Sequence, residues 1–375
     1  MPYQTKTAAL LFLLLIIFLS AGCAKPKVAS KPRPTPIPTG IPIPEFPLKI
    51  EINGQMMSPM VPTLFMLPGD PLVVRIINEN GQPAGDRVNA RPETESWSVV
   101  FNGYPLALGE NNLFSGTAPK VPGFYSLEFK NRQKLNQASV FRNSSPGQRN
   151  EKTGPTLLVI ILHPYSRLKD GFIDQYPIGL YPNPEKAPAN IIPKNAQSKY
   201  LPPKGFIELT PENQGLPVSM HYRLQDFSCR LNAPFPHFIA LSPALLLKLE
   251  LLTLTLKQYL QNPEARLTIL NSFRPPGYNH TVSGALWSRH IYGDAADIIV
   301  DISPPDRLMD DLNHDGRIDR DDVMVLADMV ESIERETGLS GGLGIYDWLR
   351  NGKEGPYLHI DTRGFKTRWE RQQEK

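Results

Sequence analysis

Hydrophobic and polar residues alternate with a period of two in several short stretches of the N-terminal half, as half-buried β-strands require. Turn residues such as those of Pro68-Gly-Asp and Pro122-Gly separate these stretches, and no helical period intervenes. The stretches begin at Leu48, Leu72, Trp97 and Phe124, and a further one begins at Thr156. The pattern therefore predicts an all-β, immunoglobulin-like sandwich over residues 48–165, with a spacer or binding role.

The pattern changes beyond about residue 205. A leucine-rich stretch over residues 241–259 has Ser242 as a candidate N-cap and Pro243 at the first helical position, which predicts a largely buried helix. Short apolar stretches at Leu267, Ile298 and Tyr357 predict strands. Residues 205–375 are therefore predicted to form an α+β domain, with a small antiparallel sheet and helices. The proline-punctuated residues 166–204 are predicted to connect it to the sandwich.

Residues 1–22 are predicted to be an export signal, because a positive start precedes an apolar run too short to span a bilayer comfortably. The run ends in Leu19-Ser-Ala-Gly-Cys23, which resembles the cleavage box of bacterial lipoproteins. This resemblance implies lipidation of Cys23 and anchoring to a bacterial membrane, at the periplasmic face of the outer membrane if the cell has one. The alternative is an ordinary secretory signal that contains a cysteine. Residues 23–47 are proline-rich and predict a tether, either polyproline II or disordered.

Composition narrows the choice of partners. The 375 residues carry a net charge of only +3, and no long basic run is present, so a nucleic-acid partner is not expected. Of the two cysteines, Cys23 is assigned to the lipid anchor, which leaves Cys229 as a lone thiol. The apolar flanks of Cys229 predict a small buried side chain rather than a nucleophile.

Two histidine and aspartate motifs are candidates for metal chemistry. His290 and Asp297 lie seven residues apart in Ser288-Arg-His-Ile-Tyr-Gly-Asp-Ala-Ala-Asp, and His359 follows about sixty residues later in Tyr-Leu-His-Ile-Asp. Two imidazoles and one carboxylate form a common inner shell of a catalytic zinc ion. The strand period places His359 and Asp361 on one face and the intervening isoleucine on the other. Taken singly, His290 is better explained as a satisfied loop histidine, and Asp297 has the alternative of a strand-end cap.

Several motifs appear in order and resemble the zinc D-Ala-D-Ala metallopeptidase family, which includes D,D-carboxypeptidases, D,D-dipeptidases and L-alanyl-D-glutamate endopeptidases of peptidoglycan. They are Ser272-Phe-Arg-Pro, Tyr278-Asn, Ser283-Gly-Ala, the ten residues from Ser288, and Leu358-His-Ile-Asp. The resemblance covers roughly residues 205–375. It implies that His290, Asp297 and His359 bind zinc, that Arg274 holds a substrate carboxylate or the developing oxyanion, and that Ser288 offers a hydroxyl to the substrate.

The general base is the open point. Many members of the family place a carboxylate three residues before the last histidine, where this chain has Pro356. Asp361 is the first candidate base, with Glu354 and Asp347 behind it, but Asp361 is equally suited to orienting a ligand or an arginine such as Arg363. The predicted function is hydrolysis of peptide bonds in peptidoglycan stem peptides or cross-links. The alternatives are a non-catalytic peptidoglycan-binding or scaffold lipoprotein and a zinc peptidase that acts on a protein.

Residues 311–322 fit the template of a calcium-binding loop, with glycine at the sixth position and a carboxylate at the twelfth. The aspartate at position twelve resembles the dockerin version of this loop. The predicted calcium ligands are Asp311, Asn313, Asp315, Arg317, Asp319 and Asp322. With a single copy inside the C-terminal domain, a structural clamp is expected, and the alternative is an acidic solvated turn.

Overall fold

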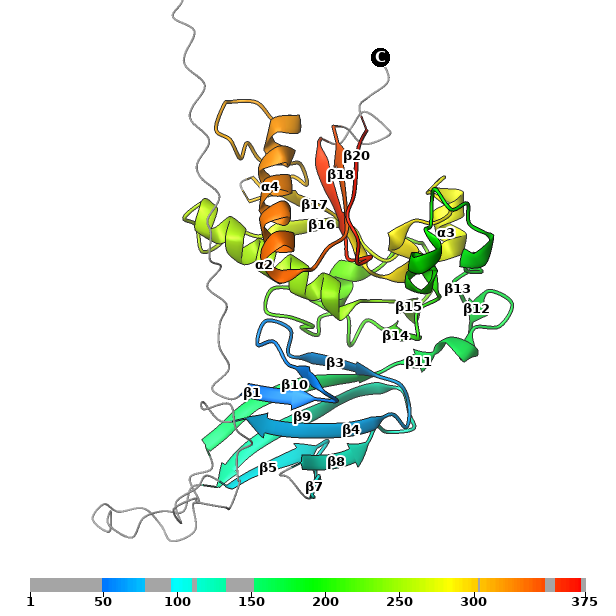
Figure 1. Ribbon diagram of the computed structural model, residues 1–375, viewed down its shortest axis with the longest axis vertical. Coiled ribbons are helices and arrows are strands. Elements are labelled where there is room, and N and C mark those ends of the chain that lie inside the picture. The colour runs from blue at the N-terminus through cyan, green and yellow to red at the C-terminus, as the bar shows by residue number, and fades with distance from the viewer. Residues whose placement is uncertain are drawn as a thin grey trace, which may run out of the picture. The chain divides into compact units, whose positions relative to one another are not determined.

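The computed structural model describes residues 49–77, 96–109, 113–132, 152–302, 304–347 and 355–371, all within one compact unit. Sheets dominate this part of the chain and helices are few, so the predicted mixture of sheets and helices is confirmed (Figure 1). The predicted signal, the tether, Cys23 and Glu354 lie outside the described residues. None of the helices within those residues is both long and apolar enough to cross a membrane.

The N-terminal half forms two five-stranded sheets that share one hydrophobic core. The first has the order β2-β1-β4-β8-β7, with β1 (Lys49–Ile52), β2 (Gln55–Met56), β4 (Pro71–Ile77), β7 (Ala107–Leu108) and β8 (Leu113–Thr117). The second has the order β3-β10-β9-β5-β6, with β3 (Thr63–Met66), β5 (Ser96–Phe101), β6 (Tyr104–Pro105), β9 (Gly123–Arg132) and β10 (Lys152–Ile161). Every second residue of β4 is buried in the shared core, as the alternation predicted. An immunoglobulin-like arrangement of these strands stays a prediction.

Residues 163–239 contain short strands and 3-10 helices. The elements are β11 (His163–Pro164), η2 (Tyr165–Arg167), β12 (Phe172–Ile173), β13 (Tyr176–Pro177), η3 (Pro184–Lys186), η4 (Lys194–Tyr200), β14 (Gly205–Leu209), η5 (Leu224–Phe227) and β15 (His237–Ile239). Ile173, Tyr176 and Ile178 are buried in the same core as the long C-terminal helices. Residues predicted to be a connector therefore supply part of the C-terminal core.

The C-terminal sheet has the order β16-β17-β19-β18-β20. Its strands are β16 (Leu267–Asn271), β17 (Ala295–Val300), β18 (Gly342–Tyr346), β19 (Tyr357–Asp361) and β20 (Thr367–Arg371), and its helices are α2 (Pro243–Tyr259), α3 (Pro276–Thr281), α4 (Arg320–Thr337) and the 3-10 helix η6 (Arg289–Tyr292). Three of its pairings are antiparallel as predicted, but β20 pairs with β18 in parallel. The sheet is mixed because the chain crosses from β19 past β18 to reach the far edge.

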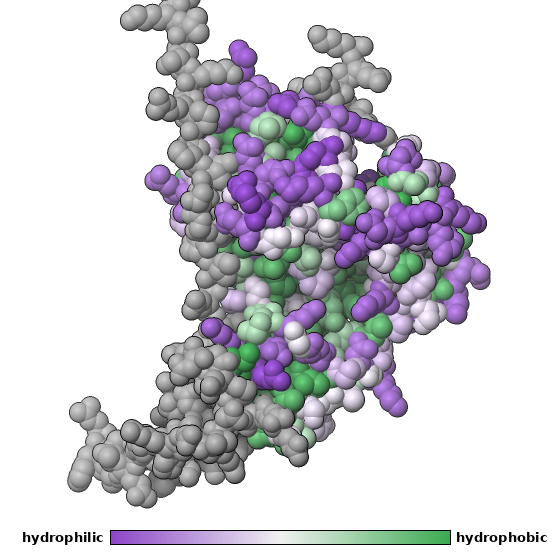
Figure 2. Space-filling view, in the orientation of Figure 1, coloured by the Kyte–Doolittle hydropathy of each residue, from purple (hydrophilic) through white to green (hydrophobic). Residues whose placement is uncertain are grey.

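Helices α2 and α4 cover one face of this sheet (Figure 1). Leu358 and Ile360 of β19 are buried in the core that they share, so the opposite face is left for the polar side chains of that strand. The N-terminus of α4 is closed by a capping box. The Asp319 side chain accepts a hydrogen bond from the backbone N–H of Asp322, and the Asp322 side chain accepts one from the backbone N–H of Asp319. In the space-filling view, the surface over the C-terminal helices and sheet is mostly hydrophilic (Figure 2).

A fragment of residues 205–375 is predicted not to fold on its own, since it lacks Ile173, Tyr176 and Ile178, all at most 2 % exposed. Removing a single large apolar side chain from a core costs about 2–5 kcal/mol, so losing three costs about 6–15 kcal/mol, as much as the entire ~5–15 kcal/mol stability of an ordinary domain. Circular dichroism should show a cooperative thermal transition for residues 49–371 and none for the short fragment. Equal, sharp transitions would contradict a shared core.

Candidate metal centre

Three predicted ligands meet on the face of the C-terminal sheet that lies opposite α2 and α4. His290 Nε2 lies 3.1 Å from Asp297 Oδ1 and 3.1 Å from His359 Nδ1, and the last two atoms are 2.9 Å apart. All three side chains are buried. Among the described residues, this is the group of three or more histidine, cysteine, aspartate or glutamate side chains that comes together closely enough to hold a metal ion.

Strand register explains how residues so far apart in sequence converge. Asp297 of β17 pairs directly with His359 of β19, which places their side chains next to each other on one face of the sheet. His290 comes from η6, the turn that precedes β17. Its Nδ1 lies 2.7 Å from the carbonyl oxygen of Ser272, and its own carbonyl accepts a hydrogen bond from the backbone of Arg274 at 3.2 Å.

The hydrogen bonds of the two imidazoles fix their tautomers. A carbonyl oxygen cannot donate, so the proton on neutral His290 resides on Nδ1, which leaves a lone pair on Nε2. The outer nitrogen of His359, Nε2, faces Asp361 Oδ2 at 3.4 Å, so a proton there leaves Nδ1 as an acceptor. With the Asp297 carboxylate, three acceptor atoms then surround one point. Such a set could hold a cation at that point.

The electrostatics agree with this assignment at His290 and Asp297. Burial lowers the pKa of His290 to about 4, so this imidazole is neutral at pH 7 and free to bind a metal. Burial alone would raise the pKa of Asp297, but the two imidazoles hold it well below its usual range and keep the carboxylate ionised. His359 is also buried, yet the carboxylates of Asp297 and Asp361 raise its pKa because they favour its protonated form.

The triangle fits a tetrahedral ion. Donor atoms about 2.0–2.1 Å from a tetrahedral metal lie roughly 3.3 Å from each other, close to the three separations seen here. One corner of the tetrahedron is then left for water or a substrate. The donor set of two imidazoles and one carboxylate suits several divalent transition metals.

The loop that carries His290 is fixed by close packing that the sequence did not predict in detail. Gly293 ends η6 with φ +74°, and a Cβ at this position would overlap the carbonyl oxygen of Ala240. The Gly293 carbonyl accepts a hydrogen bond from Ser242 N at 2.9 Å, which ties the turn to the start of α2. The tight closure of this turn therefore depends on the absence of a side chain at Gly293.

A buried ion pair brackets the same loop. Arg289 Nε donates to Asp294 Oδ1 at 3.0 Å, and the Arg289 guanidinium lies 4.5 Å and 4.4 Å from the ring centres of Tyr200 and Tyr292. Its Nη1 also donates to the Lys199 carbonyl at 2.8 Å, so η4 is fastened to the ligand loop. Sequence reasoning missed this clamp. Its one local signal is the opposite charges that flank His290 inside the motif.

Asp361 lies behind His359 and not at the point where the three acceptors meet. Its carboxylate accepts hydrogen bonds from Arg363 Nε at 3.0 Å and from Gly342 N at 2.7 Å. Burial would raise its pKa, but His359 and Arg363 lower it well below the usual range. Of the two roles open to Asp361, this geometry favours orienting the His359 ring.

A network of buried charges contacts the backbone of Asp361. Lys248 of α2 is fully buried and donates to Glu334 Oε1 at 2.6 Å and to the Asp361 carbonyl at 2.9 Å. Glu334 also accepts from Arg368 Nη2 at 2.5 Å. The network joins α2, α4 and β20 to the strand that bears His359. The position of Lys248 among the leucines of α2 was its only signal in the sequence.

The other residues predicted to act at the site, Arg274, Ser288 and Asp347, do not belong to the metal triangle. Arg274 is half-buried, its Nε has no hydrogen-bond partner among the described residues, and its charge lowers the pKa of His290. Ser288 is half-buried at the start of η6, where its hydroxyl makes no capping hydrogen bond. Asp347 is close enough to Arg320 and Glu370 for their charges to affect its pKa, which burial raises, and it is no part of the metal triangle.

Aromatic side chains stand beside the centre on the same face. Tyr346 and Tyr357 stack with ring centres 4.5 Å apart, and Trp369 Nε1 donates to the Tyr346 hydroxyl at 3.0 Å. The Trp369 ring lies 5.1 Å from that of His359. A Cβ on Gly344 would overlap Trp369, so the glycine of β18 makes room for this wall.

The predicted calcium loop folds back on its own backbone. Asp311 accepts from the backbone of Asp315 at 3.2 Å and of Gly316 at 2.8 Å, and Asp322 accepts from Leu312 N at 2.7 Å. Asn313 accepts from Asp315 N, and Asp315 from Arg317 N. The loop's carboxylates do not form a close group of the kind seen at His290, so calcium stays a prediction from the sequence.

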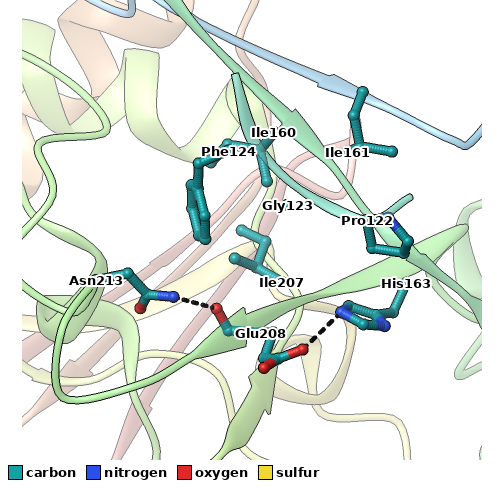
Figure 3. A pocket seen from close by; sticks show the side chains of 9 residues that line it. All are labelled: Pro122, Gly123, Phe124, Ile160, Ile161, His163, Ile207, Glu208 and Asn213. Atoms are coloured by element: carbon teal, nitrogen blue, oxygen red, sulfur yellow. Dashed lines mark hydrogen bonds and ion pairs between the residues drawn. The ribbon is translucent and has the colours of Figure 1, made fainter. Parts of the chain in front are cut away.

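A separate hollow of about 200 Å³ lies where β9 and β10 meet β14 (Figure 3). His163 and Glu208 point toward each other at its rim, with Nε2 and Oε2 2.9 Å apart. Its walls are otherwise mainly apolar, and the amide of Asn213 is occupied by Glu208 O and Thr210 N. No nucleophile or set of metal ligands faces it among the described residues.

The chain was compared with protein-family models, curated proteins and solved structures, and none of them matched it.

Two glycines with the same backbone conformation allow a matched test of the ligand loop. Gly293 and Gly338 both have φ +74°, but a Cβ on Gly338 would meet no atom within 4 Å. We predict that Gly338→Ala costs about 1–2 kcal/mol of unfolding free energy, the ordinary penalty of the left-handed region. Gly293→Ala should cost more, since Ala240 must move, and should weaken metal binding. Similar values from denaturant titration of both variants would contradict this reason for Gly293.

Asp361→Asn separates the two roles open to Asp361. If it orients His359, the variant should bind metal about 10–100-fold more weakly, as is common when such a partner is changed. If it is the base, metal affinity should hold while turnover is lost. We expect weaker binding, measured by competition with a chromophoric chelator. Unchanged affinity would contradict the orienting role.

Proposed function

We propose that this chain is a zinc-dependent peptidase of the bacterial cell envelope, and that it hydrolyses peptide bonds in peptidoglycan stem peptides or cross-links. The observation that carries the proposal is the convergence of His290 Nε2, Asp297 Oδ1 and His359 Nδ1, three buried acceptors about one point. Two imidazoles, one carboxylate and an open fourth corner are the ligand arrangement of catalytic zinc. The substrate class comes from the resemblance of the surrounding motifs to the D-Ala-D-Ala metallopeptidases.

Zinc bound here would polarise the scissile carbonyl and lower the pKa of a bound water to about 7. Residues of the chain would bind the substrate and orient the metal ligands. Arg274 offers a buried guanidinium Nε without a partner, suited to a substrate carboxylate or to charge that develops on the carbonyl oxygen. Asp361 holds the outer nitrogen of His359, and Ser288 offers a hydroxyl at the entry of η6.

The competing proposal is a peptidoglycan-binding protein with a metal site that does not cut. It is favoured by the lack of a free carboxylate beside the triangle among the described residues, because Asp361 is occupied by Arg363 and Gly342. Pro356 stands where many members of the resembled family have the base, and Glu354 lies outside the described residues. Metal binding is common to both proposals, and turnover separates them.

Two parts of the proposal rest on the sequence alone. Lipidation of Cys23 would tether the chain to a membrane through the proline-rich residues 23–47. Calcium at residues 311–322 would brace the start of α4, since the loop leads directly into that helix. Peptidoglycan peptides and a membrane are therefore the proposed partners, with zinc and calcium as the proposed metals.

Purified chain should contain about one zinc ion and should shorten muropeptides, as mass spectrometry would detect. His290→Ala removes a ligand, so metal content and cleavage should both fall to background. His280→Ala changes an exposed histidine of α3 and should alter neither. Metal-free protein that leaves muropeptides intact would contradict the peptidase, and bound zinc without cleavage would favour the binding protein.

A further inference from the structure

A hollow of about 280 Å³ lies along the outer edge of β16. Leu267, Thr268 and Ile269 of the strand form one side of it, and His221, Arg266 and Arg307 contribute polar walls. β16 is the end strand of its sheet, and no backbone hydrogen bond joins its outer edge to other described residues. A free strand edge inside a hollow is a template for another extended chain.

The hollow carries an excess of positive charge. Neither Arg266 nor Arg307 forms an ion pair with a described residue. Asp226 also lines the site; burial raises its pKa, and the charge of Arg266 is close enough to lower it, so Arg307 carries the less compensated charge of the two. Arg307 is fixed in place by its backbone N–H, which donates to the buried Asp301 carboxylate at 3.0 Å. Two unpaired guanidinium groups beside a free edge favour an anionic partner, since arginine pairs well with carboxylates.

The wall formed by His221 is built from buried charge. Glu250 of α2 is fully buried, and its two oxygens face His221 N at 2.7 Å and His221 Nδ1 at 2.5 Å. Lys257 Nζ lies 2.9 Å from the other ring nitrogen. A buried carboxylate is costly unless it is well paired, so this wall is held rigidly in one position.

We propose that this hollow binds an extended acidic peptide, which adds a strand to the outer edge of β16 and places its carboxylates against Arg266 and Arg307. Backbone hydrogen bonds along the edge would give affinity, and the two guanidinium groups would select the charge. The strand ends at Asn271, which pairs with Asp297, so at ~3.4 Å per residue the strand residues of the hollow, Ile269 to Leu267, lie about 7–14 Å along β16 from that pairing. The binding itself does not depend on the metal.

The test uses the full chain stripped of metal with a chelator, so that it is separate from any peptidase activity. A fluorescent peptide of alternating valine and glutamate should bind with saturable anisotropy, and its valine–lysine counterpart should not. The double change Arg266→Ala and Arg307→Ala should weaken binding at least ten-fold, while Arg230→Ala, at an exposed arginine outside the hollow, should leave it unchanged.

A peptide with N-methylated backbone amides tests the strand pairing, because it keeps the carboxylates but loses the donors that a strand edge needs. We expect it to bind at least ten-fold more weakly. Absence of saturable binding by the acidic peptide would overturn the proposal. So would equal binding of the methylated peptide together with displacement by inorganic phosphate, since the hollow would then be a site for small anions only.

Discussion

Three acceptor atoms held within about 3 Å of each other can hold a metal ion between them, and buried contacts of the C-terminal half keep the side chains that carry these atoms in place. Repulsion among two ring lone pairs and a carboxylate would otherwise push the side chains apart. Each one is instead held from behind: His290 by the Ser272 carbonyl, and His359 by Asp361. Preorganisation of this kind is what a metal ion gains from a protein.

The support behind these ligands consists largely of buried charge. Lys248 with Glu334, and Arg289 with Asp294, are removed from water, and such pairs seldom add net stability over a well-packed apolar core. Their positions indicate that these pairs contribute to the placement of the ligands. Lys248 also binds the Asp361 carbonyl in the strand of His359, and Arg289 also binds the Lys199 carbonyl from the loop of His290, so these charges help to place the ligands. Losing one partner would leave a buried, unpaired charge and would disturb the centre as well as the fold.

Local patterns predicted part of this structure well. The period of two placed His359 on the face opposite Leu358 and Ile360, and Pro243 marked the first residue of α2. The strands β18 and β20 were not predicted, because one is glycine-rich and the other is polar on a sheet edge. Their places depend on pairing with β19 and on Trp369 filling the space above Gly344.

Interactions between distant residues explain the other gaps. The core position of Tyr176 depends on ring contacts with His237 and Phe238, more than sixty residues away, which the proline-rich sequence around it does not indicate. The three candidate metal ligands were predicted because their residue types and spacing carry chemistry of their own. The Arg289 clamp was not, since a single arginine and a single aspartate look the same on a surface as in a buried pair.

X-ray absorption at the zinc edge of the purified full chain tests the metal centre most directly. The predicted spectrum contains two imidazole nitrogens and further oxygen or nitrogen donors at about 2.0–2.2 Å, with no sulfur. The spectrum of the variant His359→Ala, which keeps His290 and Asp297, should show one imidazole fewer. A zinc ion with a sulfur ligand, or protein that takes up no zinc after purification, would contradict a centre built from His290, Asp297 and His359.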